Sequence, residues 1–116
     1  MVVKVRLEFK LISAKKTADG HILRLNLKNA GNRILKNIVV RPSYLAQNFS
    51  NDSLSFFVYA LMPDSDETVT FRISIPYPKL IWFSVSGYAN GDSYFSLESP
   101  LLTVRAKDTE ESLILT

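Results

Sequence analysis

Apolar and polar residues alternate along most of the chain, and this two-residue period predicts β-strands with one buried and one solvated face. The clearest example runs from His21 to Pro42 and has the pattern of strand, turn, strand. Residues 23–28 alternate leucine with a polar residue, residues 29–32 are turn formers, and a β-branched apolar run follows until Pro42. We predict that the other strands are built around this pair.

Five further segments have the composition of strands. They cover residues 2–12, 54–61, 67–75, 80–89 and 94–106. Polar connections with turn formers separate them at 13–20, 43–53 and 62–67. Pro76 and Pro78 end the strand at residue 75, because proline cannot donate a hydrogen bond to a sheet. The strongest hairpin turn in the chain, Asn90-Gly91-Asp92, joins the last two of these strands.

The last predicted strand changes its phase part-way. Its apolar residues lie at odd positions in Phe95 and Leu97 but at even positions in Leu102 and Val104. A one-residue shift exchanges the two faces of a strand, so we predict a bulge or kink at Ser99-Pro100. Residues 107–116 begin polar and end apolar, which predicts a mobile tail, with a short added strand as the alternative.

About seven strands, turn signals between them and no useful helical period predict an all-β fold, an antiparallel sandwich of two sheets. A small barrel is the alternative. The predicted domain covers residues 1–106, followed by the tail at 107–116.

Composition narrows the possible functions only a little. A chain of 116 residues with 47% apolar and 22% charged residues is typical of one globular domain, and its formal net charge of +3 permits contact with anions without implying it. The absence of cysteine excludes disulfides and thiolate zinc sites. Neither a signal peptide nor an apolar run of roughly 20 residues is present, so no membrane insertion is expected. Either the full protein is intracellular, or this is a domain whose targeting segment lies elsewhere.

Two segments carry a more specific pattern of strand, turn and strand. The first is LNLKNAGN at residues 25–32 followed by LKNIVV at 35–40, and the second is LMPDSDETVTF at 61–71. Their order and spacing resemble the CARDB family, a fibronectin-III-like sandwich module common in archaeal and bacterial surface proteins. Asp64 stands where that family usually has glycine, and the family's acidic, asparagine-rich final hairpin is missing.

The resemblance covers roughly residues 3–106 and implies an immunoglobulin/fibronectin-III-like sandwich. It also implies a non-catalytic spacer, adhesion or partner-binding module, since the family has no catalytic residues to transfer. An enzyme is the least expected class, and no cofactor is expected.

Polar residues offer few candidates for chemistry. His21 is the single histidine, and with no recognisable nucleophile nearby we expect it to lie at the surface. Asp64, Asp66 and Glu67 supply three carboxylates in four residues but not the alternating pattern of a calcium loop, so a solvated turn is expected and no metal site. Asn48 and Asn51 begin N-glycosylation sequons, which favour an extracellular or cell-surface location if the source glycosylates its proteins.

Aromatic residues give the most useful functional hint. The phase of residues 80–89 places Trp82 and Tyr88 on the outer face, where they could form an apolar patch with Phe57 and Tyr59. Such a patch predicts a surface for a protein partner or for self-association, and carbohydrate stacking is the alternative. A second minor core under the loop at 43–53 would instead bury these rings.

A nucleic-acid interface is a weaker hypothesis, and no nucleic-acid partner is expected. It would use the basic residues near the N-terminus, but the outer face of the strand at residues 2–12 supplies neither interleaved aromatic residues nor a glycine-rich loop. These residues are Lys4, Arg6, Lys10, Lys15 and Lys16.

Overall fold

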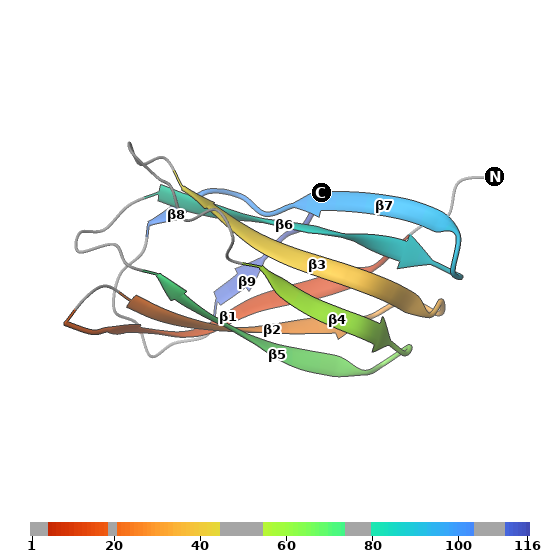
Figure 1. Cartoon of the computed structure of the whole chain (residues 1–116), viewed down its shortest axis with the longest axis horizontal. Coiled ribbons are helices and arrows are strands. Elements are labelled where there is room, and N and C mark those ends of the chain that lie inside the picture. The colour runs from red at the N-terminus through yellow and green to blue at the C-terminus, as the bar shows by residue number, and fades with distance from the viewer. Residues whose placement is uncertain (1–4, 19–20, 45–54, 74–79, 104–110) are drawn as a thin grey trace.

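Two antiparallel β-sheets packed face to face make up the protein in a computed structural model, which confirms the predicted all-β sandwich (Figure 1). The structure describes residues 5–18, 21–44, 55–73, 80–103 and 111–116. Its strands are β1 (Leu7–Lys16), β2 (His21–Asn29), β3 (Leu35–Tyr44), β4 (Phe56–Leu61), β5 (Asp66–Ile73), β6 (Leu80–Ala89), β7 (Ser93–Glu98), β8 (Leu102–Thr103) and β9 (Glu111–Leu113).

The first sheet has the strand order β5-β2-β1-β9, and the second has β4-β3-β6-β7 with β8 also paired to β6. The two strands of the stretch from His21 to Pro42 therefore form as predicted but do not pair with each other. Strand β2 pairs with β1 and β5, whereas β3 pairs with β4 and β6. The turn between β2 and β3 carries the chain from one sheet to the other.

Two strands extend beyond their predicted ends. Strand β1 continues to Lys16, because an irregularity between Leu11 and Ser13 shifts its phase and buries Ala14 in the core. Strand β3 continues through Pro42 to Tyr44. Proline is tolerated there because the β3–β4 ladder ends at Val40, opposite Phe56, so no β4 residue needs a hydrogen bond from Pro42.

The core lies between the sheets and is centred on three phenylalanines. Phe83 of β6 makes an edge contact with Phe9 of β1, at 5.4 Å between ring centroids, and stacks on Phe71 of β5 at 5.8 Å. The predicted inward residues of β6, which are Ile81, Phe83 and Val85, are fully buried. Aromatic pairs of this geometry contribute about 0.5–1.5 kcal/mol beyond the burial of their area.

The predicted hairpin and kink are both present. Asn90 and Gly91 have φ of 54° and 87°, the left-handed values that a tight hairpin turn requires, and β6 pairs with β7 across them. Ser99 is buried after β7, and its backbone N–H donates to the carbonyl of Phe83 at 2.9 Å. Its Oγ accepts from the N–H of Phe83 at 2.8 Å. The Ser99 side chain thus takes the acceptor position that a backbone carbonyl oxygen would hold in a regular ladder, at the point where the strand changes phase.

The end of the chain forms the added strand that was the alternative to a mobile tail. Strand β9 pairs with β1, and Leu113 is buried in the core. Thr116 then exchanges two backbone hydrogen bonds with Glu98 at the end of β7, at 2.8 and 2.9 Å. The last residues therefore contact both sheets.

A buried asparagine joins the two turns at one end of the sandwich. The Asn29 side chain, at the end of β2, donates to the carbonyls of Arg33 and Leu61 at 2.7 and 2.9 Å and accepts from the Gly31 N–H at 3.0 Å. Its backbone bonds to residues 64 and 65 in the turn before β5. Asp64 in that turn has φ of 64°, which asparagine, aspartate and glycine tolerate best.

We expect Asn29→Ala to lower the free energy of unfolding by roughly 2–4 kcal/mol, because it leaves buried carbonyls without a donor. The matched control is Asn26→Ala, which removes only a surface hydrogen bond to Asp66 and should cost less than about 0.5 kcal/mol. Urea denaturation followed by circular dichroism measures both. Equal losses for the two variants would contradict this role of Asn29.

Gly87 should not tolerate a side chain. A Cβ at this position would lie 3.0 Å from the carbonyl oxygen of Lys36 and 3.2 Å from the Cα of Ile38, where the register between β3 and β6 shifts. Gly87→Ala is therefore expected to destabilise the fold by about 1–3 kcal/mol through overpacking. Gly31→Ala, whose Cβ would have only ordinary contacts at 3.5 Å and beyond, is the control for thermal unfolding. A Gly87→Ala variant as stable as the wild type would refute the overpacking.

Candidate interaction surface

Four aromatic side chains lie on the outer face of the second sheet. Val58 of β4 points into the core and is 5% exposed, so its neighbours Phe57 and Tyr59 point outward and are 58% and 71% exposed. On β6, Gly87 and Ala89 are buried while Tyr88 between them is 37% exposed, and Tyr94 of β7 is 64% exposed. We call these four residues the aromatic face.

The register between neighbouring strands shows which residues of the aromatic face lie opposite one another. Val39 of β3 lies opposite Phe57 on one side and Ser86 on the other. Tyr88 lies two residues beyond Ser86 and is directly opposite Tyr94, with 5.5 Å between their ring centroids and an interplanar angle of 66°. Residues opposite each other on one face of a sheet interact through their side chains, so the two tyrosines form an ordered pair.

Trp82 does not belong to this group. It lies on the same side of β6 as Tyr88, as its phase predicts, but six residues away, a distance of roughly 20 Å along a strand. It is also only partly exposed and lies opposite Ser43. The structure thus places Phe57, Tyr59 and Tyr88 on the aromatic face and separates Trp82 from them.

Tyr94 is a member of the aromatic face that the sequence reasoning missed. The signal was present: a three-residue turn at 90–92 places Ala89 opposite Ser93, and therefore Tyr88 opposite Tyr94. Counting outward from the turn would have found the pair.

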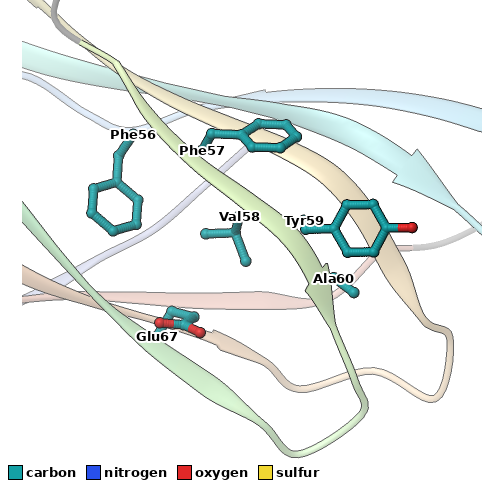
Figure 2. A pocket seen from close by; sticks show the side chains of 6 residues that line it. All are labelled: Phe56, Phe57, Val58, Tyr59, Ala60 and Glu67. Atoms are coloured by element: carbon teal, nitrogen blue, oxygen red, sulfur yellow. The ribbon is translucent and has the colours of Figure 1, made fainter.

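A shallow hollow of about 310 Å³ adjoins the aromatic face, where β4 and β5 form the neighbouring edges of the two sheets (Figure 2). It is lined by Phe56, Phe57, Val58, Tyr59, Ala60 and Glu67. Phe57 and Tyr59 point away from β5, whereas Phe56 and Val58 point towards it. Glu67 lies opposite Leu27, which is buried, so its carboxylate is on the inward side of β5 at the rim of the sandwich.

The expectation that His21 lies at the surface is wrong, because this residue is only 3% exposed. It has the same phase as Leu23, Leu25 and Leu27, so it points into the sandwich at the start of β2. The alternation in the sequence already contained this information.

The charged candidates remain solvated side chains. Asp64, Asp66 and Glu67 are exposed, and Asp66 accepts a hydrogen bond from Asn26 at 2.9 Å. Within the described ranges no three His, Asp or Glu side chains are grouped so that they could hold a metal ion. Of the basic residues, Arg6, Lys15 and Lys16 are exposed and Lys10 is partly exposed, whereas Lys4 is outside the described residues. Asn48 and Asn51 are outside them as well.

Comparison of the chain with protein-family models, with curated proteins and with solved structures gives no match. In the part of the chain that the structure describes, no helix has the length and apolar character needed to cross a membrane. The function must therefore be inferred from the surface itself.

The contact between Tyr88 and Tyr94 should be measurable as a coupling energy. We expect each single alanine substitution to be mildly destabilising, and the double variant to lose about 0.5–1.5 kcal/mol less than the sum of the single losses. A double-mutant cycle from urea denaturation measures this difference. The same cycle for Tyr59 and Tyr94, which lie on opposite edge strands of the sheet, should show no coupling. Additive effects at Tyr88 and Tyr94 would mean that their ring contact does not form in solution.

Proposed function

We propose that the protein is a non-catalytic β-sandwich module that binds a protein partner through its aromatic face, as a spacer, adhesion or interaction unit of a larger protein or assembly. The observation that carries this proposal is the exposure of Phe57, Tyr59, Tyr88 and Tyr94 on one side of one sheet. Four rings so exposed present roughly 350–550 Å² of mainly apolar surface. Patches of this size on a single protein are often functional.

The chemistry of the face favours a protein over other partners. Tyrosine and phenylalanine are enriched at protein interfaces because they bury a large area with few rotatable bonds, and a tyrosine hydroxyl keeps a polar contact at the rim. Between the rings lie Val39, Ser86 and Ser96, which are small or uncharged, and Lys36, an exposed residue of β3 opposite Tyr88. A partner therefore meets mainly apolar and uncharged groups and one positive charge, that of Lys36, from which a carboxylate or carbonyl oxygen of the partner would have to accept a hydrogen bond.

The arrangement of the strands supports an immunoglobulin/fibronectin-III-like subtype as part of the proposal. In such sandwiches the first, second and fifth strands share one sheet, and the third joins the last two in the other. Here β1, β2 and β5 lie in the first sheet, and β3, β6 and β7 in the second. Strand β4 lies in the second sheet beside β3, unlike the fourth strand of a constant-type immunoglobulin domain, which lies in the first. The two segments that resemble the CARDB family also meet at Asn29, which bonds to the turn at residues 64 and 65. A cell-surface location would agree with that resemblance and with the sequons at Asn48 and Asn51.

Carbohydrate binding has less support. Stacking of sugars needs rings that present a common plane, but Tyr88 and Tyr94 are inclined at 66° and Trp82 is only partly exposed and far from both. Binding of soluble oligosaccharides at millimolar concentration, detected as chemical-shift changes limited to the rings, would overturn this ranking.

Site-specific photocrosslinking tests the proposed interface. A photoreactive phenylalanine analogue at position 94 should form covalent adducts with a protein in cells of the source, because Tyr94 is exposed on the aromatic face. The control carries the same analogue at Thr70, an exposed position on the outer face of the first sheet. Adducts at neither position, or equally at both, would contradict the proposal.

A further inference from the structure

We propose that the free edge of β4 binds an extended segment of the partner protein as an added strand, and that Glu67 selects a segment with a lysine or arginine on its inward side. The proposal deepens the function proposed above and rests on it, since it specifies how the partner is held beside the aromatic face. It follows from three observations: the state of the sheet edges, the hollow beside β4 and the charge in that hollow.

Among the described residues, β4 is the edge strand that has no charged side chain. An edge strand offers unpaired N–H and C=O groups, and proteins usually protect such edges with charges, short strands or a covering segment. Strand β5 carries Asp66, Glu67 and Arg72, β9 has three residues, and β7 is capped at Glu98 by Thr116. By contrast β4 has the sequence FFVYAL over its six residues, with neither a charge nor a proline.

The side chains of β4 suit strand addition. An incoming strand would place alternate side chains outward beside Phe57 and Tyr59, and the others inward beside Phe56 and Val58 (Figure 2). Backbone hydrogen bonds would supply affinity, and the side-chain contacts would supply specificity. The outward side chains of the incoming strand would also extend the aromatic face across the new strand.

Glu67 determines the charge of the occupant. Its carboxylate lines the hollow on the inward side of β5, facing the space next to β4 (Figure 2). An apolar or acidic inward side chain there would desolvate or repel the carboxylate, whereas a lysine or arginine would pair with it. A second copy of this chain fits less well, since its own β4 would bring only apolar side chains and a second Glu67.

Selection from a random peptide library tests this inference without knowledge of the natural partner. The purified chain should enrich peptides with alternating β-branched or aromatic residues and a lysine or arginine at one inward position. The Glu67→Lys variant should enrich aspartate or glutamate at that position instead. The matched control, Glu98→Lys, reverses an exposed charge on β7, at the other edge of the same sheet, and should leave the selected peptides unchanged.

The enriched peptide should bind Glu67→Lys at least roughly fivefold more weakly than the wild type, since a favourable pair of partly exposed charges becomes a repulsive one. On binding, the amide hydrogens of β4 that point away from β3 should exchange more slowly, whereas those of β5 should not.

Three results would overturn the inference: no enriched peptide, an unchanged charge preference in Glu67→Lys, or protection at an edge other than β4. A purified chain that dimerises with protected β4 amides would overturn it too, because the occupant would then be a second copy. Crosslinking at Tyr94 together with any of these results would leave the proposed function in place, so the two failures are distinguishable.

Discussion

The buried amide of Asn29 is the constraint on which the rest of the structure depends. An amide group removed from water must find partners for its polar atoms, and this one contacts backbone groups of Gly31, Arg33 and Leu61. Those three residues belong to two of the four places where the chain leaves one sheet for the other, after β2 and after β4. One side chain thus fixes these two crossings, because moving either turn would leave a buried polar group unpaired.

The position of the candidate surface is a consequence of those crossings. Leu61 ends β4, and its carbonyl is held by Asn29 while the next turn returns the chain to β5 beside β2. Strand β4 therefore lies at the edge of its sheet, next to Glu67 of β5. Its outward side chains lie on the same face as those of β6 and β7. The aromatic face and the hollow are separate features chemically, but the same turn positions both.

Local signals in the sequence predicted local structure well, and long-range arrangement poorly. The bounds of β6, the turn at Asn90-Gly91 and the kink at Ser99 were predictable because neighbouring residues determine them. Alternation gives the inward face of a strand but not its neighbour, so it could not show that β2 and β3 lie in different sheets. Tyr94 was missed, and Trp82 was grouped with Tyr88, because phase was considered without distance along the strand. The position of the Glu67 carboxylate in the hollow could not be predicted either, because it depends on β5 of one sheet lying beside β4 of the other.

The pairing of β9 with β1 has a consequence for how the protein is made. Leu113 lies opposite Phe9, so this ladder joins residues that are about a hundred positions apart in the sequence. A ribosome releases the first strand long before the last, and during that interval the edge of β1 stays unpaired and Phe9 lacks one of its neighbours. The first sheet is therefore complete only after residues 111–113 have been made, as is expected of sheets dominated by distant contacts. Until then the nascent chain exposes an open edge to chaperones or to other nascent chains.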